Sequence, residues 1–196
     1  ANEHQIEESQ KAVANMEVII GDQNRLRAVA EDFINHYETR VAEGATVAGK
    51  AMFVCMNRYI AYDLYKILIE LRPEWAVKKV ATDGVELTEK DKKELKPIEM
   101  LKLVMTRNKD DDKELFDMLG TKDDRKEFDR QFKNPKSNFK IAIVVDMWLT
   151  GFDVPELDTI YIDKPIQQHT LIQTISRVNR VCEGKDKGLI VDYIGI

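Results

Sequence analysis

Apolar residues recur at every third or fourth position in the first quarter of the chain, a spacing that predicts helices with one buried face. Residues 3–20 start charged and end apolar, and we expect a helix there. Asp22 is suited to cap a second helix that runs to about Ala42. The apolar positions that place this second helix against a core are Leu26, Val29, Ala30, Phe33, Ile34 and Tyr37.

After these helices the pattern changes to short apolar runs without polar interruptions. Residues 51–56 form the first run, which is typical of a strand covered on both faces. Asn57 is suited to cap the helix that follows, and Pro73 ends it. A weaker strand is predicted at 77–82, before a turn.

Residues 83–136 are unlike the rest of the sequence, because they contain 15 acidic and 14 basic residues. Charges at this density cannot all be buried, so the stretch is predicted to be a solvated excursion with an exposed face of mixed charge. Short helices are expected near 97–105, 111–119 and 122–133.

Buried-strand patterns return in the last third of the chain. The expected strands are 141–145, 159–162 and 189–191, with a helix over 167–181. Strands that alternate with helices require right-handed crossovers and a mostly parallel sheet, so the predicted fold class is α/β.

Two parts of the chain differ in this pattern, and we expect them to differ in structure. Residues 1–48 are predicted to form a helical N-terminal segment. Residues 49–196 are predicted to form the α/β domain, with a charged helical insertion at about 84–122.

Composition narrows the class of protein further. The 196 residues are 43% hydrophobic, and their formal net charge of −5 gives no general attraction to nucleic acid. No apolar run approaches the length of a membrane-spanning helix, and the first residues lack the profile of a secretory signal. Two cysteines form no disulfide framework, and three scattered histidines have no metal-ligand spacing. We therefore expect a cytoplasmic protein with no membrane partner and no metal site.

The turn that leaves the predicted strand 141–145 is a candidate ligand site, because open parallel sheets bind ligands beyond the carboxyl ends of their strands. Gly151 allows the backbone to approach a ligand closely, and Asp153 is suited to accept hydrogen bonds from ribose hydroxyls. The alternative is a tight turn in which Asp153 caps a helix or Pro155 ends a loop.

The predicted helix 167–181 carries a second candidate site. At about 100° per residue, Gln173, Arg177 and Arg180 fall on one face. The opposite, apolar face consists of Leu171, Ile175 and Val178. Two neighbouring guanidinium groups favour an anion or a carboxylate in front of them. The alternative is a surface helix whose arginines pair with acidic side chains.

The sequence has no G-x-x-x-x-G-K-[ST] phosphate loop and no strand that ends in the Asp-Glu pair that holds magnesium. The chain can therefore supply arginines to a nucleotide but cannot cradle the nucleotide unaided. This combination indicates half of a nucleotide site.

In order and spacing, the two candidate sites resemble motifs V and VI in the second RecA-like lobe of superfamily 2 helicases and translocases. The pattern D-x-x-x-x-G-x-D-x-P is matched by Asp146, Gly151, Asp153 and Pro155. The pattern Q/H-x-x-G-R-x-x-R is matched by Gln173, Arg177 and Arg180, with Ser176 in place of the glycine. The segments DMWLTGFDVPELDTIYIDKP and LIQTISRVNRV look, more narrowly, like the motor (restriction) subunit of type I restriction–modification enzymes.

This resemblance implies a RecA-like three-layer lobe without its own phosphate loop, and it implies roles in ATP hydrolysis. Arg177 and Arg180 would reach the ATP phosphates, with Arg180 as the arginine finger. Gln173 would position the attacking water, while Gly151 and Asp153 would meet the ribose and the γ-phosphate. The ATP and its Mg²⁺ would be held mainly by a first RecA-like lobe.

The resemblance also implies contacts to double-stranded DNA through the backbone. The positions that match the family's DNA contacts are Asn57, Arg58, Thr82, Gly84, Asp146 and Met147. Expected partners are the first lobe and the modification and specificity subunits, with residues 83–136 as one possible docking surface for the modification subunits. The alternatives are the second lobe of another superfamily 2 DNA or RNA helicase, and a catalytically silent RecA-like interaction module.

Overall fold

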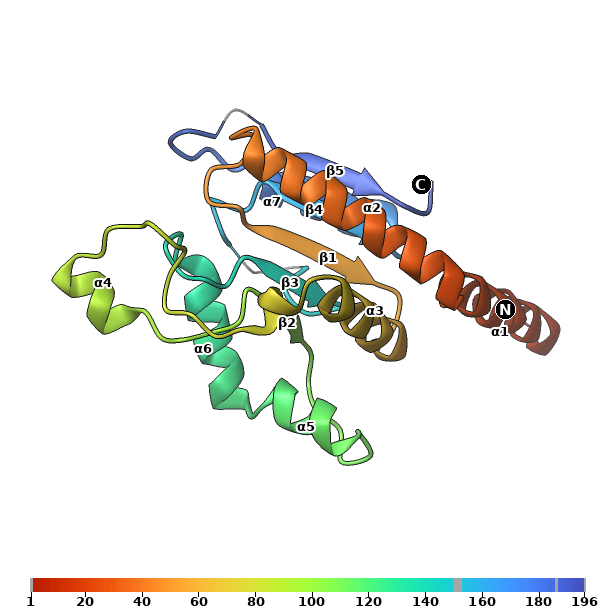
Figure 1. Cartoon of the computed structure of the whole chain (residues 1–196). Helices are drawn as coiled ribbons and strands as arrows, with labels where there is room; N and C mark the ends of the chain where they lie inside the picture. Colours follow the sequence, from red (N-terminus) through yellow and green to blue (C-terminus); the bar gives the residue numbers. More distant parts are fainter. Residues whose placement is uncertain (1, 150–152, 186, 196) are drawn as a thin grey trace.

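Parallel strands form a single sheet at the centre of the molecule (Figure 1). The computed structural model describes residues 2–149, 153–185 and 187–195. Within them the sheet has five strands in the order β2-β3-β1-β4-β5. The strands are β1 (Ala51–Cys55), β2 (Leu101–Val104), β3 (Ile141–Val144), β4 (Thr159–Asp163) and β5 (Leu189–Asp192). This arrangement confirms the predicted α/β class with a parallel sheet.

Helices cover both faces of the sheet. The described helices are α1 (Glu3–Ile20), α2 (Gln23–Ala42), α3 (Arg58–Leu71), η1 (Pro73–Ala76), α4 (Glu89–Glu94), α5 (Lys113–Leu119), α6 (Lys122–Lys133) and α7 (Gln168–Val178). Successive strand residues point to opposite faces, so each strand feeds two cores. Phe53 and Tyr161 join the core beneath α2 and α3, whereas Val54 and Ile162 join the core beneath α6 and α7.

The strand register places the carboxyl ends of the central strands side by side. Val54 of β1 is level with Val144 of β3 and with Ile162 of β4. On the other side of β3, Val104 of β2 is level with Val144. The loops that leave these strands therefore meet at one edge of the sheet, which we call the carboxyl edge.

Helix α2 is joined to the carboxyl edge by an ion pair whose carboxylate is fully buried and whose arginine is 24% exposed. Arg25 Nη1 donates to Asp163 Oδ2 at 2.9 Å, and Arg25 Nη2 donates to Asp163 Oδ1. The same guanidinium donates to the carbonyl of Ile20 at 3.0 Å and to that of Tyr193 at 3.5 Å. The Asp163 carboxylate is fully buried, and its partner raises the pKa of Arg25. One side chain thus connects the end of α1 to the ends of β4 and β5.

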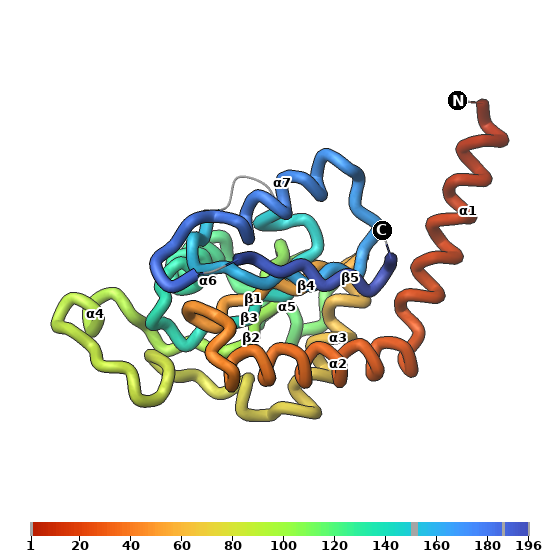
Figure 2. The backbone as a smooth tube through the Cα atoms, turned by 90° about the horizontal axis from the view of Figure 1, so that it is seen from above, coloured from red at the N-terminus to blue at the C-terminus, as the bar shows by residue number. Residues whose placement is uncertain are grey.

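Helix α1 stands away from the rest of the molecule, whereas α2 lies along the sheet (Figure 2). Ile20 is the buried residue of α1, while Leu26 and Phe33 of α2 are completely buried in the core. The division of the chain at residue 48 stays a prediction. The packing shows that α2 contributes to the same core as β1 and α3.

The structure corrects two expected elements. Residues 97–105 do not form a helix, because Leu101–Val104 are strand β2 at the edge of the sheet. Residues 77–82 form no regular strand; Lys79 and Ala81 make isolated antiparallel bridges instead. The charged stretch is therefore more than a solvated excursion, since it supplies a buried strand as well as the expected α5 and α6 and the unexpected short helix α4.

Candidate functional site

A pocket of about 320 Å³ lies at the carboxyl edge, between the loops that leave β1, β2 and β3. Its lining residues are Met56, Asn57, Arg58, Val104, Met105, Thr106, Val145, Asp146 and Met147. Four of the six positions expected to contact nucleic acid line this pocket: Asn57, Arg58, Asp146 and Met147. We call it the edge pocket.

Helix α3 begins at the edge pocket. The Asn57 side chain caps the helix, because its Oδ1 accepts a hydrogen bond from the Ile60 amide at 2.9 Å. The amino terminus of this 14-residue helix carries partial positive charge and unpaired amides, which favour an anion nearby.

The Arg58 side chain fixes the loop after β2. Its Nη2 contacts both carboxylate oxygens of Asp111 at 2.6 Å, and its Nη1 donates to the Thr106 carbonyl at 2.9 Å. Desolvation opposes ionisation of Asp111, yet the Asn108 amide and Arg58 together lower the pKa of this carboxyl group. The guanidinium of Arg58 is therefore engaged within the chain, and its backbone remains the group available at the pocket.

Thr82 and Gly84, also expected to contact DNA, do not line the edge pocket, and their role stays a prediction. Ala81 bridges to Ser137, and the Thr82 amide donates to the Lys136 carbonyl at 3.4 Å. Ser137 comes four residues before β3 begins. These contacts place the Thr82 turn at the amino-terminal side of the sheet. The loop after β2 occupies the place at the edge pocket that the sequence interpretation gave to this turn.

A lysine that the sequence interpretation did not single out contacts the loop after β3. Lys164 Nζ lies 2.6 Å from Asp146 Oδ1 and donates to the Val145 carbonyl at 3.2 Å. Lys164 directly follows β4, Asp146 follows β3, and β1 lies between these strands. The pair therefore spans the carboxyl end of the central strand.

The two arginine candidates, Arg177 on α7 and Arg180 just after it, contact the bend that follows β3. Arg180 Nη1 lies 2.8 Å from Asp153 Oδ2, and the Arg177 Nε donates to the Leu149 carbonyl at 2.9 Å. Both side chains of the Arg180–Asp153 pair are about half exposed. The structure thus brings the two motifs together, while Gly151 lies outside the described residues.

The shape of α7 differs from the expected helix 167–181. The helix ends at Val178, so Arg180 follows the helix and does not share its face. The buried side of α7 consists of Thr174 and Val178, whereas Ile175, expected to be buried, is 37% exposed. Gln173 lies on the exposed side of the helix.

The arginines lie at the far end of α7 from the edge pocket. Gly188, which directly precedes β5, packs so closely against the Val178 carbonyl that an added Cβ would lie 2.2 Å from the oxygen. The end of α7 is therefore beside the amino end of β5. Arg177 with Leu149 and Arg180 with Asp153 form what we call the arginine–bend group. This group and the edge pocket are two separate sites, and both include residues that follow β3.

Trp148 in this connecting loop has an unusual backbone conformation. Its φ of 65° is in the left-handed region, which is costly for a residue with a large side chain. The indole stacks on Phe132 of α6 at 5.3 Å between ring centroids. This packing holds the loop in a conformation that the backbone alone disfavours.

The sequence interpretation missed several residues of the edge pocket, in particular Met105 and Thr106, and it missed Asp111, which pairs with Arg58 beside the pocket. The signal was the short run Leu101–Val104 followed by polar residues, the same pattern as after β1. Lys102 obscured this signal, because it places a charged residue within the apolar run. In the structure this lysine is 5% exposed and pairs with Glu99 at 2.8 Å.

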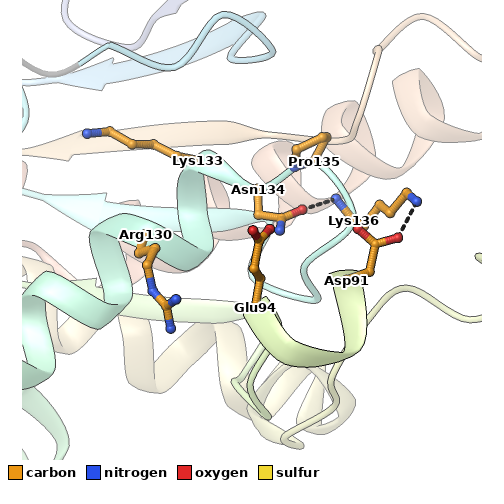
Figure 3. Close-up of a pocket in the computed structure, with 7 residues that line it drawn as sticks. All are labelled: Asp91, Glu94, Arg130, Lys133, Asn134, Pro135 and Lys136. Carbon is orange, nitrogen blue, oxygen red and sulfur yellow. Dashed lines mark hydrogen bonds and ion pairs between the residues drawn. The ribbon is translucent and has the colours of Figure 1, made fainter. Parts of the chain in front are cut away.

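A larger pocket, about 500 Å³, lies between α4, α6 and the segment that leads into β3 (Figure 3). Its basic side chains pair with neighbouring carboxylates. Lys136 contacts Asp91 at 2.5 Å, and Arg130 contacts Glu127 at 2.6 Å. Lys136 and the Thr88 cap lower the pKa of Asp91 to about 2. We assign no ligand to this pocket.

Two kinds of feature are absent from residues 2–149, 153–185 and 187–195. Among these residues, no three or more His, Cys, Asp or Glu side chains are grouped so that they could hold a metal ion. No helix built from them is long and apolar enough to cross a membrane.

Comparisons with known proteins assign this chain to a family. The sequence family described as type I restriction enzyme subunit R domain 3 matches residues 47–195. The HindI endonuclease subunit of a type I restriction enzyme from Haemophilus influenzae is 37% identical over 97% of this chain. A protein named as the MjaIXP endonuclease subunit, from Methanocaldococcus jannaschii, is 39% identical over 100% of the chain. This chain spans 16% of the length of each relative.

Solved structures show the same fold at low sequence identity. A fragment described as the HsdR subunit of a type I restriction enzyme from Vibrio vulnificus YJ016 aligns with a TM-score of 0.54 and 15% identity, over 87% of this chain and 28% of that one. T4 UvsW aligns with a TM-score of 0.50 and 14% identity, over 91% of this chain and 27% of that one. The fold is RecA-like, and the chain belongs to the family of type I restriction enzyme R subunits, in which it corresponds to domain 3.

Proposed function

We propose that this chain is the second helicase lobe of the ATP-dependent, DNA-translocating motor subunit of a type I restriction enzyme. The observation that carries the proposal is the arginine–bend group. Arg177 and Arg180 contact the bend at Leu149 and Asp153 in a chain that has no phosphate loop of its own. Such a lobe completes a nucleotide site whose other half lies on a first RecA-like lobe.

The Arg180–Asp153 pair suits an arginine that must reach a nucleotide. Both side chains are about half exposed, and exposed ion pairs are worth about 0–1 kcal/mol. Arg180 can therefore leave Asp153 at little cost and turn towards a triphosphate. A guanidinium that meets the charge developing during phosphoryl transfer raises the rate by about 10³–10⁵.

Neighbouring groups on α7 support the same assignment. Gln173 is exposed and lies one helical turn before Arg177, where it can position water or a phosphate oxygen. Ile172 is 56% exposed on the outer side of α7. An exposed apolar side chain beside the arginines fits a face that another lobe covers. In the proposed site ATP is the substrate, and its Mg²⁺ is held mainly by the first lobe.

On the DNA side, the edge pocket offers backbone and helix-terminus contacts to phosphates of one strand. The start of α3 at Asn57 and the backbone of Asp146 and Met147 face this pocket. Contacts of this kind need no overall positive charge, which agrees with the net charge of −5. The modification and specificity subunits complete the proposed complex, in the cytoplasm.

The test uses the full-length subunit in its complex and measures ATP hydrolysis with double-stranded DNA, single-stranded DNA and RNA. We expect double-stranded DNA to stimulate hydrolysis most strongly. Stimulation by RNA alone would indicate another kind of superfamily 2 helicase. Because this chain holds only half of the nucleotide site, turnover of ATP by a clean preparation of residues 1–196 would contradict the proposal.

Arg180→Ala tests the arginine finger directly. We expect a loss of about 10³–10⁵ in kcat. Arg130→Ala is the matched control, because Arg130 is 51% exposed and pairs with Glu127 at 2.6 Å, whereas Arg180 is 52% exposed and pairs at 2.8 Å. We expect Arg130→Ala to hydrolyse ATP at the normal rate. Near-normal hydrolysis by Arg180→Ala would leave a catalytically silent RecA-like module as the better interpretation.

A further inference from the structure

We propose that Lys164 is a positioning residue that couples DNA contact at the edge pocket to the placement of Arg177 and Arg180. The inference rests on the proposed function and adds to it a residue that transmits between the two sites. Its basis is the contact of Lys164 with Val145 and Asp146 across the end of β1.

Two contacts give Lys164 control over the loop after β3. The ammonium pairs with the Asp146 carboxylate at 2.6 Å and donates to the Val145 carbonyl at 3.2 Å. The Lys164 side chain is only 21% exposed, whereas Asp146 is 84% exposed. An ion pair with so exposed a carboxylate contributes little by itself. The hydrogen bond to the carbonyl holds the main chain where it leaves β3, and this main chain lines the edge pocket.

The connection continues along both segments. Lys164 contacts Val145 and Asp146, Arg177 contacts the Leu149 carbonyl, and Arg180 contacts Asp153. These contacts occur in the same order along the loop after β3 and along the segment from β4 through α7. The two segments are thus in contact at residues 145–146, at 149 and at 153 of the loop. A shift of the loop at its contact with Lys164 therefore changes where Arg177 and Arg180 can lie.

Charge gives Lys164 a second effect at the same place. A DNA phosphate that enters the edge pocket meets the Asp146 carboxylate, and like charges repel. The Lys164 ammonium neutralises this carboxylate and draws it towards β4. Without Lys164, the carboxylate and the loop are both released into the path of the phosphate.

The experiment uses the full-length subunit in its complex and compares Lys164→Met with Lys164→Arg. It measures ATPase rates over a range of double-stranded DNA concentrations. We expect Lys164→Met to lower the ratio of DNA-stimulated to basal rate at least tenfold and to raise the half-stimulating DNA concentration. Arginine keeps the charge and the donors, so Lys164→Arg should retain the ratio within about threefold.

Lys126→Met is the control, because Lys126 pairs with Asp123 at 3.8 Å but is 71% exposed, and it lies on α6 and does not line the edge pocket. We expect it to match the unchanged subunit. If Lys164→Met does not fold, Lys164→Gln replaces it as the uncharged variant, and its stimulation ratio is compared with that of Lys164→Arg. The inference is overturned if the uncharged variant keeps the stimulation ratio, or if basal and stimulated rates fall equally. Absence of DNA stimulation in the unchanged subunit would instead refute the proposed function.

Discussion

The buried pair between Arg25 and Asp163 gives the most direct test of how the helical segment is joined to the sheet. Arg25→Ala leaves a fully buried carboxylate without its partner. Breaking a buried pair from one side costs about 3–5 kcal/mol, because the remaining charge is desolvated and unpaired. Domains have free energies of unfolding of about 5–15 kcal/mol, so this loss is a large fraction of the total.

Urea denaturation of the chain, followed by circular dichroism, measures the effect. With a urea m-value of about 2.5 kcal/mol per molar, a loss of 3–5 kcal/mol lowers the midpoint by roughly 1–2 M. The matched control is Arg27→Ala on the same helix, because Arg27 contacts Glu70 at 2.9 Å but the two side chains are 44% and 63% exposed. We expect this control to lose less than about 1 kcal/mol.

A double substitution tests the cause of the loss. In Arg25→Met with Asp163→Leu neither charge of this pair remains, so we expect most of the lost free energy of unfolding to return. The reasoning is refuted if Arg25→Ala costs no more than Arg27→Ala. It is also refuted if the double variant is less stable than Arg25→Ala alone.

Three further predictions concern the core, the thiols and a buried lysine. Deletion of residues 1–48 removes the α2 side of the core and should abolish cooperative thermal unfolding, whereas deletion of residues 1–19 should preserve it. Native protein should expose one thiol to Ellman's reagent and denatured protein two, because burial raises the pKa of Cys55, while Cys182 is partly exposed; equal reaction of both in native protein would contradict this. Burial lowers the pKa of Lys140 in the folded protein from its ordinary value of 10.5 to about 8. Between these two pH values the unfolded chain binds more protons than the folded chain, so the contribution of Lys140 to the free energy of unfolding rises with pH there. Chemical denaturation at pH 7.5 and 9.5 should show a smaller rise in Lys140→Met, and an equal rise would show that Lys140 is not the cause.

The sequence predicts the central strands well, because β1, β3 and β4 are buried on both faces and each contains an uninterrupted apolar run, which in β4 is residues 160–162. Strand β2 was not predicted from the sequence, because Lys102 interrupts its apolar run. In the structure Lys102 pairs with Glu99, and its ammonium lies over the Phe128 ring at 4.2 Å from the centroid. Local charge thus hid a strand whose burial depends on contacts with distant segments.

The candidate site was predictable where its residues follow the central strands, as Asn57 and Asp146 do. The sequence interpretation placed the Thr82 turn directly after a strand of the sheet, but residues 77–82 form no regular strand. The loop after β2 meets the edge pocket instead, and this follows only from the order of the strands in the sheet. Lys164 could not be found from spacing, because its contact with Asp146 depends on two strands that are separated by β1.

The contacts of Arg25 have a mechanical consequence. One planar guanidinium holds the last carbonyl of α1 and the last residue of β4, while the rest of α1 projects from the molecule. A change in the angle of the helix at its base therefore strains or breaks a contact of Arg25. The residue at the sheet end of this contact, Asp163, is the chain neighbour of Lys164, so the contacts of α1 and of the loop after β3 meet at adjacent residues.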